Sequence, residues 1–275
     1  MESLQMANWN DKVVLVTGGS RGLGLAIAEA FARHGAAVTI LARDAAQLER
    51  ALGELRAAAG AGARVASAIA DVTRAEQVDA AVQQVVGRHG RLDVLVNCAG
   101  RSARGAVLET SAEDFRALLE LNFLSVVHAT QAAAPQLLLA RGHVVNIGSL
   151  ASKVGARYYG AYPATKHALA AYTQQLRLEL GPQGLHVLLV CPGPIARREP
   201  DERQGIADAN VPSWARQPGG NARIRAIDPR RLAERIVRAC ERREPELVVP
   251  WKARLLFSIA ALSPRLGDWL LRRMT

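Results

Sequence analysis

Short runs of apolar, mostly β-branched residues alternate with longer amphipathic segments over most of the chain. The runs have the length of buried strands and occupy residues 13–17, 36–41, 64–70, 93–97, 143–148, 185–191 and 246–250. Apolar positions at helical spacing predict helices up to residue 34, at 44–59, 74–89, 111–139 and 229–243, and from 162 onward. Strand and helix alternate at least six times, so we predict an α/β fold. It would be one doubly wound parallel sheet with helices on both faces, in a single domain spanning residues 1–275.

Polar residues mark several of the helix ends. Ser111, with Asp114 three positions later, resembles a capped helix start, and Asp228 before Pro229 pairs an N-cap with a first-turn proline. The long helix that Ser111 opens carries Asn122 in a mostly apolar context, where a buried amide must find partners. Asn122 either holds a water near the chemistry described below or satisfies carbonyl groups of the core.

Composition agrees with a globular domain. The 275 residues are 49% apolar and 22% charged, which allows a substantial core. The first residues show no basic segment followed by an apolar run, and no stretch reaches about 18 uninterrupted apolar residues, so we expect neither a signal peptide nor a spanning helix. The three cysteines are widely spaced and match no metal or disulfide pattern, which favours a cytoplasmic protein without a metal site.

The net charge of +10 raises the question of an acidic partner. Residues 197–275 carry 17 basic and 10 acidic side chains, so most of the excess lies in the last third of the chain. These basic residues form no lysine-rich run and no nucleic-acid motif, and a solvated, arginine-rich face explains them equally well. We therefore expect no nucleic-acid binding.

A glycine-rich turn follows the first predicted strand. Gly18, Gly22 and Gly24 stand between strand 13–17 and the first helix, where glycine permits a tight turn and a close backbone approach. The N-terminus of the helix attracts a pyrophosphate. This placement predicts a dinucleotide site; the alternative is a glycine turn that binds no ligand.

The end of the second predicted strand bears on which dinucleotide binds. An NAD site would place a carboxylate there for the ribose diol, but the chain has Ala42, followed by Arg43 and Asp44. Arg43, together with Arg21 in the glycine turn, can instead hold a 2′-phosphate through charge-assisted hydrogen bonds. We therefore predict NADP(H) over NAD(H); the alternative is a pair of solvated arginines.

Two further strand ends carry candidate cofactor residues. Asp71 follows strand 64–70, where its side chain can reach an adenine edge; it can also cap the next helix, and the two roles are compatible. Strand 93–97 leads into Cys98, Ala99 and Gly100, small residues that would let a cofactor lie against the strand end.

The candidate chemistry lies in residues 149–166. Ser149 follows strand 143–148, and Tyr162 and Lys166 stand four positions apart at the start of a helix that Pro163 can open. That spacing puts both side chains on one helical face, where an ammonium lowers the pKa of a phenol toward working pH. A hydroxyl, a tunable phenol and a lysine predict a proton-transfer site for a carbonyl or alcohol. A tyrosine and a lysine at this spacing also occur as ordinary interface or capping residues.

In combination these motifs resemble the short-chain dehydrogenase/reductase family. The matching pieces follow family order and spacing over roughly residues 9–195. They are TGGSRGLG (17–24), Asp71-Val72, NCAG (97–100), Asn122, Ser149, YPATK (162–166) and CPG (191–193). The family implies a Rossmann-type sheet of about seven strands and a homo-oligomer, a dimer or a tetramer.

The resemblance also implies roles for the matched positions. Tyr162 would be the general acid or base and Ser149 would orient the substrate oxygen. Lys166 would bind the nicotinamide ribose and lower the pKa of the tyrosine, and Asn122 would hold a proton-relay water. Together with the residues above, the expected cofactor contacts are Gly18, Ser20, Arg21, Gly22, Leu23, Gly24, Arg43, Asp71, Val72, Asn97, Ala99, Gly100, Tyr162, Lys166, Pro192, Gly193 and Ile195.

The chain departs from the family pattern at two positions. Arg197 stands where the family often has a threonine that contacts the nicotinamide carboxamide, although the backbone at Ile195 can still serve. Cys98 replaces a frequent second asparagine, which is a small change.

The last third of the chain is the least constrained by the resemblance. Residues 197–226 are polar and rich in Arg, Pro and Gly, and we predict a mobile lid over the substrate pocket. Residues 251–275 combine an apolar run from Leu255 to Leu262 with a break at Pro264 and several flanking basic residues. They predict either an interfacial helix at a membrane or a helix pair packed over the substrate mouth or on a neighbouring subunit.

We therefore predict an NADPH-preferring carbonyl reductase, or the reverse alcohol dehydrogenase, with a substrate that is lipophilic if the tail contacts lipid. The alternatives are a dinucleotide-binding regulator with little turnover, a membrane-associated scaffold, and an epimerase or dehydratase of the wider family. The complete set of Ser149, Tyr162 and Lys166 argues against the regulator.

Overall fold

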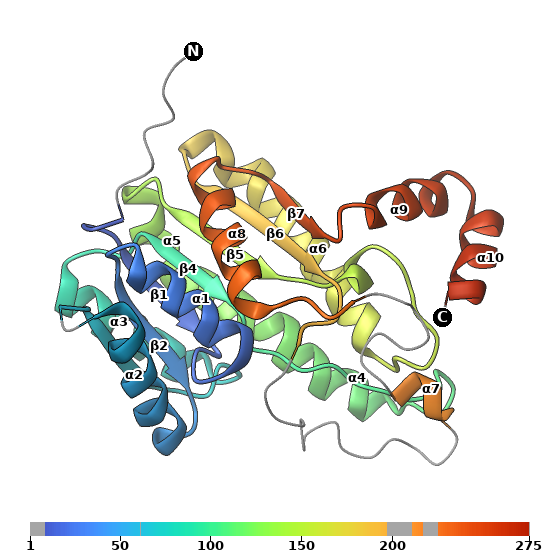
Figure 1. Cartoon of the computed structure of the whole chain (residues 1–275), viewed down its shortest axis with the longest axis horizontal. Coiled ribbons are helices and arrows are strands. Elements are labelled where there is room, and N and C mark those ends of the chain that lie inside the picture. Colours follow the sequence, from blue (N-terminus) through green and yellow to red (C-terminus); the bar gives the residue numbers. More distant parts are fainter. Residues whose placement is uncertain (1–8, 61, 197–210, 217–224, 275) are drawn as a thin grey trace.

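A computed structural model describes residues 9–60, 62–196, 211–216 and 225–274 (Figure 1). Up to residue 147 the elements are β1 (Val13–Thr17), α1 (Gly22–Arg33), β2 (Ala37–Ala42), α2 (Ala45–Ala59), β3 (Val65–Ile69), α3 (Ala75–His89), β4 (Val94–Asn97), α4 (Ala112–Leu119), η1 (Glu120–Leu124), α5 (Ser125–Leu139) and β5 (His143–Ile147). They continue with η2 (Leu150–Ser152), α6 (Tyr162–Leu180), η3 (Gly181–Gln183), β6 (His186–Pro192), α7 (Ser213–Arg216), α8 (Pro229–Glu241), β7 (Glu246–Val249), α9 (Ala253–Leu262) and α10 (Pro264–Met274).

The seven strands form one parallel sheet in the order β3-β2-β1-β4-β5-β6-β7. The predicted α/β fold is thus confirmed. Most ends of the predicted strands lie one residue away from the observed ends, and the others coincide. The order of the strands reverses between β1 and β4, and in open α/β sheets such a switch point is where ligands bind, at the carboxyl ends of the strands.

Helices cover both faces of the sheet, as predicted (Figure 1). Helices α1, α2 and α8 pack on one face, around fully buried side chains such as Ile27, Phe31 and Ile236. Helices α3, α5 and α6 pack on the other, with the β strands contributing the middle layer of both cores. The strands are buried on both sides, which explains why their sequences are apolar throughout rather than alternating.

The long helix predicted from Ser111 to Leu139 is present but is not uniform. Its start has the predicted capping box, in which Ser111 Oγ accepts from Asp114 N–H (3.1 Å) and Asp114 Oδ2 accepts from Ser111 N–H (3.2 Å). A π-helical turn, η1, then separates α4 from α5 and contains Asn122. Hydrophobic spacing did not predict this turn, because one widened turn barely changes the pattern.

The alternative role considered for Asp71, that of N-cap of the following helix, is wrong. Helix α3 begins only at Ala75, with Arg74 in the N-cap position and no side-chain hydrogen bond there. Asp71 Oδ1 instead accepts from the backbone N–H and the hydroxyl of Thr73 (3.0 and 2.8 Å). The carboxylate therefore closes a turn ahead of the helix.

Helices α9 and α10 form a hairpin that projects from the β7 end of the sheet (Figure 1). It divides at Pro264, as predicted. Ala253 and Phe257 pack against the core residues Leu189, Cys191 and Val248, so α9 is anchored by one edge only. None of the described helices is long and apolar enough to cross a membrane.

Only part of the predicted lid lies within the described residues. Residues 211–216, which include α7, and residues 225–226 are described. Arg197 and the rest of the segment 197–226 lie outside them.

Candidate active site

The three candidate catalytic side chains converge at the carboxyl end of β5. Lys166 Nζ donates to the carbonyl of Ile147 at 2.8 Å, and Ile147 is the last residue of β5, two positions before Ser149. The same ammonium lies 5.9 Å from the centre of the Tyr162 ring. Helix α6 starts at Tyr162 with Pro163 in its first turn, so the predicted spacing does place phenol and ammonium on one face.

Lys166 is an unusual lysine because it is only 6% exposed. Burial disfavours the ammonium form and lowers the pKa of Lys166 from 10.5 to about 8. Near neutral pH the side chain therefore still carries its charge, but a modest rise in pH removes it.

Ser149 sits in a short turn that orients its hydroxyl. Ser149 Oγ accepts from Ala151 N–H at 3.1 Å, and Ser149 N–H donates to Ser152 Oγ at 3.1 Å. Because the oxygen is already an acceptor toward the backbone, the hydroxyl hydrogen points away from the turn. The group can therefore donate to a substrate oxygen.

Asn122 in the π turn connects the segment after β4 to the start of α6. Its Oδ1 accepts from Arg101 N–H (2.9 Å), and its Nδ2 donates to the carbonyl of Arg101 (2.9 Å) and to Thr165 Oγ1 (3.1 Å). Thr165 Oγ1 in turn donates to the carbonyl of Tyr162 (2.8 Å). The amide thus holds two segments of the site in register.

The glycine turn is shaped for a close ligand. A Cβ on Gly18 would lie 2.8 Å from Ala99 Cα, so the turn can approach the segment after β4 only because residue 18 is glycine. Gly22 has a φ of +57°, and a Cβ there would meet nothing within 4 Å. Helix α1 begins at Gly22 without a side-chain cap and without an acidic residue in its first turn. Its N-terminus is therefore available to an external anion.

The end of β2 and the end of β3 bring two predicted cofactor residues together. Arg43 Nη1 lies 3.4 Å from Asp71 Oδ2, with the Arg43 side chain 60% exposed. Burial raises the pKa of Asp71, but the hydrogen bonds from Thr73 and Arg43 outweigh it and leave the pKa below its ordinary value. Asp44, the carboxylate that NAD would require, accepts from Gln47 N–H and caps α2.

Asn97 is placed differently from the other predicted cofactor residues. Its side chain is buried and donates to Asn146 Oδ1 at 2.9 Å, and Asn146 Nδ2 donates to Thr173 Oγ1 at 2.9 Å. The asparagine pair therefore ties β4 and β5 to α6 inside the protein. Asn97 thus holds the elements of the site together from inside the protein.

Four polar residues that hold the elements of the site together were not singled out from the sequence, although Thr17 and Thr165 lie within the motifs TGGSRGLG and YPATK. Thr17 Oγ1 accepts from the N–H groups of Cys98 and Ala99 (3.1 and 3.2 Å), which pins the segment after β4 to β1. Asn146, Thr165 and Thr173 are the other three. A polar residue inside an apolar strand or helix face, next to a motif, was the available signal.

The remaining predicted cofactor residues lie at the same edge of the sheet. Leu23 and Val72 are buried, and Pro192 is the last residue of β6. Gly193 N–H donates to the carbonyl of Val249 (2.7 Å), and Ile195 pairs with Ile227. Ser20 and Arg21 lie between β1 and α1, Gly24 lies in the first turn of α1, and Gly100 lies in the segment after β4.

The described part of the segment 197–226, the predicted lid, contacts residues near Tyr162. Arg104 Nε donates to the carbonyl of Ala215 in α7 (2.8 Å), and its guanidinium lies 3.8 Å from the centre of the Tyr159 ring. The Tyr159 ring is 6.3 Å from that of Tyr162. These contacts connect α7 through Arg104 to Tyr159, which lies near Tyr162.

A cavity of about 240 Å³ lies between the segment after η2, helix α6 and the α9–α10 hairpin. Its lining combines apolar side chains, among them Val154, Phe257 and Leu271, with Lys153, Asp268 and His167, the residue after Lys166. None of the candidate catalytic side chains lines it.

Known proteins resemble this chain in sequence. Residues 12–203 match a family model described as short chain dehydrogenase. The zebrafish (Danio rerio) dehydrogenase/reductase SDR family member 7B is 36% identical over 190 residues, which make up 68% of this chain and 62% of the relative's own length. The match thus spans less than two thirds of that relative.

Solved structures share the whole architecture. A short-chain dehydrogenase from Streptomyces avermitilis superposes with a TM-score of 0.79 and 32% identity, covering 94% of this chain and 95% of that structure. A variant of actinorhodin polyketide ketoreductase, solved with NADPH, superposes with a TM-score of 0.74 and 32% identity, covering 89% and 97%.

Proposed function

This chain belongs to the short-chain dehydrogenase family of oxidoreductases, and we propose that it interconverts a ketone and a secondary alcohol, acting as an NADPH-dependent reductase. The observation that carries the proposal is the position of Lys166. Its ammonium donates to the carbonyl of Ile147 at 2.8 Å and lies 5.9 Å from the centre of the Tyr162 ring, so Tyr162 and Lys166 lie at the end of β5, the strand that Ser149 follows.

In the proposed reduction, Tyr162 gives its phenolic proton to the carbonyl oxygen of the substrate. The hydroxyl of Ser149 donates a hydrogen bond to the same oxygen, which orients the carbonyl and stabilises the negative charge that develops on it. The Lys166 ammonium stabilises the phenolate that remains, which makes Tyr162 a stronger acid near neutral pH. Oxidation of an alcohol uses the same groups in reverse.

The residues present fit a nicotinamide dinucleotide. The uncapped N-terminus of α1 and the open space at Gly22 suit a pyrophosphate, and the small residues Ala99 and Gly100 leave room along the end of β4. When bound, the cofactor supplies the hydride and the protein supplies orientation and the proton.

We infer a preference for NADPH from Arg43. Among the described residues, the partner of its exposed guanidinium is Asp71, at the long distance of 3.4 Å, so a 2′-phosphate can replace that carboxylate. Asp44 is occupied as a helix cap, which weakens the case for NAD. The NADPH named with the similar actinorhodin ketoreductase supports the same choice.

Fluorescence energy transfer from tryptophan to nicotinamide tests the cofactor. We expect wild type to bind NADPH more tightly than NADH, and Arg43→Ala to lose about 10- to 100-fold in NADPH affinity, the value of a charge-assisted phosphate contact. Affinity for NADH should hardly change. Arg50→Ala, on the exposed side of α2, is the matched control. Tighter NADH binding would reverse the assignment, and no binding of either would end the enzyme proposal.

The Tyr162→Phe variant separates an enzyme from a dinucleotide-binding regulator. Removing the general acid should lower turnover of a reducible ketone by about 10²- to 10⁴-fold, while NADPH affinity stays within about threefold because the ring remains. Equal turnover in wild type and variant, over a panel of ketones, would favour the regulator.

We further propose that the substrate is lipophilic and that the hairpin brings the protein to a membrane surface. Trp251, just before the hairpin, is 64% exposed and Leu262 at the end of α9 is 88% exposed, and basic side chains stand among them. Apolar side chains interleaved with arginine and lysine suit the headgroup region of an anionic bilayer. A homo-oligomer, common in the family, is the other arrangement that would cover this surface.

A further inference from the structure

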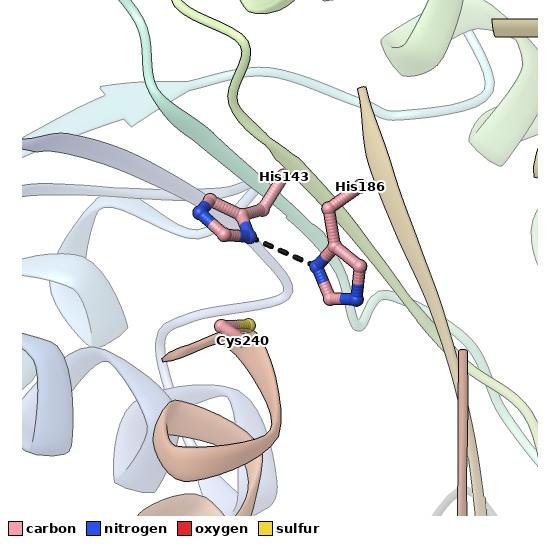
Figure 2. Close-up of side chains that lie close together, drawn as sticks. All are labelled: His143, His186 and Cys240. Carbon is pink, nitrogen blue, oxygen red and sulfur yellow. Dashed lines mark hydrogen bonds between the residues drawn. The ribbon is translucent and has the colours of Figure 1, made fainter. Parts of the chain in front are cut away.

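A second cluster of reactive side chains lies at the opposite end of the sheet from the candidate active site. His143 begins β5, His186 begins β6 and Cys240 lies in the last turn of α8 (Figure 2). One ligand atom from each residue lies within 4.8 Å of the other two, and this is the only such trio among the residues that the structure describes. Cys240 is fully buried and His186 is 5% exposed.

We propose that His143, His186 and Cys240 form a binding site for a single Cu(I) ion. The sequence indicated no metal site, because the two histidines are 43 residues apart and Cys240 is farther still. Only the parallel pairing of β5 with β6, in which His143 stands opposite His186, brings them together.

The hydrogen bonds of the two rings define their protonation. His186 Nε2 lies 2.8 Å from the carbonyl of Glu244, which can only accept, so His186 Nε2 carries a hydrogen. In a neutral ring His186 Nδ1 is then an acceptor, and His143 Nδ1–H donates to it across 2.9 Å.

This arrangement is close to that of a pair of metal ligands. Two nitrogens bound at 2.0–2.1 Å with a trigonal or tetrahedral angle lie about 3.4 Å apart, so the rings need to separate by about 0.5 Å from their present 2.9 Å. The His186 N–H bond to the Glu244 carbonyl is the outer contact that typically orients a ligating histidine. The Trp9 ring, 5.7 Å from that of His143, adds an apolar wall.

Binding of the ion involves no change of oxidation state, and its protons are accounted for as follows. The thiol of Cys240 loses its proton to solvent and its sulfur binds the ion as thiolate. The hydrogen on His143 Nδ1 moves to Nε2 of the same ring, which frees Nδ1. One proton is released for each ion bound, and copper remains Cu(I).

Charge selects the monovalent ion. One thiolate and two neutral imidazoles with Cu(I) give a site of zero net charge, whereas Zn(II) would leave a positive charge buried. Lys12 and Arg243 already act on His143 as positive charges, and Asp93, which acts on it as a negative one, is ion-paired with Lys12 and Arg91. Glu241 acts on Cys240 as a further negative charge, and its carboxylate accepts from Trp9 Nε1–H. A buried net charge is costly, and thiolate with imidazole is a ligand set that suits Cu(I).

The test titrates full-length, metal-free protein with Cu(I) under anaerobic conditions, in competition with a chromogenic Cu(I) chelator. We expect one tightly bound ion per chain, release of about one proton, and an X-ray absorption spectrum of two nitrogen ligands and one sulfur. Cys240→Ala should lower the affinity about 100-fold or more, and bound Cu(I) should raise the melting temperature of wild type but not that of Cys240→Ala.

Matched variants keep the test decisive. Cys98→Ala/Cys191→Ala removes the other two thiols and should bind as wild type does. If Cys240→Ala fails to fold, His186→Gln takes its place. Glutamine keeps a donor for the Glu244 carbonyl but removes one imidazole ligand, so the affinity for Cu(I) should fall as in Cys240→Ala. Copper binding that survives loss of Cys240, or is lost with Cys98 and Cys191, would overturn the site. Stoichiometric Zn(II) binding in place of Cu(I) would overturn the choice of ion.

Discussion

At the scale of single residues, Lys166 is the group whose environment says most about function. The side chain is buried, yet it stays protonated near neutral pH, and its ammonium donates a hydrogen bond to a backbone carbonyl at the end of β5. A buried lysine destabilises a fold unless its charge is used. In the proposed reaction the charge is used to stabilise the Tyr162 phenolate.

The pKa of Lys166, about 8, predicts a pH dependence. As pH rises through about 8 the ammonium loses its proton, and with it the stabilisation of the Tyr162 phenolate. We expect kcat/KM for NADPH in ketone reduction to be level near pH 7 and to fall by up to about tenfold per pH unit above 8. Initial rates across this range measure it.

Lys166→Arg is the control for that profile, because arginine stays charged throughout. Its rates should be lower than those of wild type but should not fall between about pH 8 and 9. A fall that is identical in the two proteins would assign the titration to another group.

At the scale of elements, the site depends on contacts between the ends of helices and strands. The π turn η1 directs Asn122 toward the segment after β4 and toward α6 at once. Thr17 holds the segment after β4 to β1, and Asn97 and Asn146 tie β4 and β5 to Thr173 in the middle of α6. The link from Asn122 to Thr165 is the one that places the N-terminus of α6, and therefore Tyr162, relative to Ser149.

Asn122→Ala should impair both stability and catalysis. The amide is fully buried and makes three hydrogen bonds, so its loss should cost about 2–4 kcal/mol of unfolding free energy. Misplacement of Tyr162 should lower kcat by about 10²-fold. Denaturant unfolding and steady-state kinetics measure the two effects.

Thr173→Val is the matched control for this prediction. It also removes a buried polar contact to α6, the one from Asn146, but it leaves the link between Asn122 and Thr165 intact. We expect a similar loss of stability with less than about a threefold change in kcat. Equal losses of kcat in the two variants would mean that Asn122 acts through stability alone.

At the scale of the whole molecule, the α9–α10 hairpin is the part that does not belong to the sheet and its two helical layers. It exposes large apolar side chains, including Trp269 (48%), and Arg273 lies 4.2 Å from the centre of that ring. A surface of this composition needs a partner to cover it.

We expect full-length protein to sediment with anionic vesicles but not with zwitterionic ones, and binding to weaken as salt rises. Trp251→Glu/Trp269→Glu should lower the bound fraction at least about fivefold, and deletion of residues 252–275 should abolish binding. Leu139→Glu, at an exposed apolar residue of α5, should have no effect. Vesicle-independent self-association that is lost in the tryptophan variant would show instead that a second copy covers the hairpin.

The amino-acid sequence determined the strands, the helices and the order of the motifs, because each depends on spacing within a few residues. It therefore predicted the parallel sheet with helices on both faces, the helix starts at Ser111 and Asp228, and the common location of Ser149, Tyr162 and Lys166 at a strand end. The roles of these residues, and the NADPH preference, stay predictions for the experiments above.

Only the tertiary structure decided which side chains meet across the sheet. The contact of Arg43 with Asp71, the partners of Asn122, the inward orientation of Asn97 and the trio of His143, His186 and Cys240 depend on strand order, register and one widened helical turn. These are long-range properties, since the residues that meet are 21 or more positions apart and nothing in the local pattern relates them. The exposure of the hairpin has the same origin, because burial of an amphipathic helix depends on what the rest of the chain leaves to pack against it.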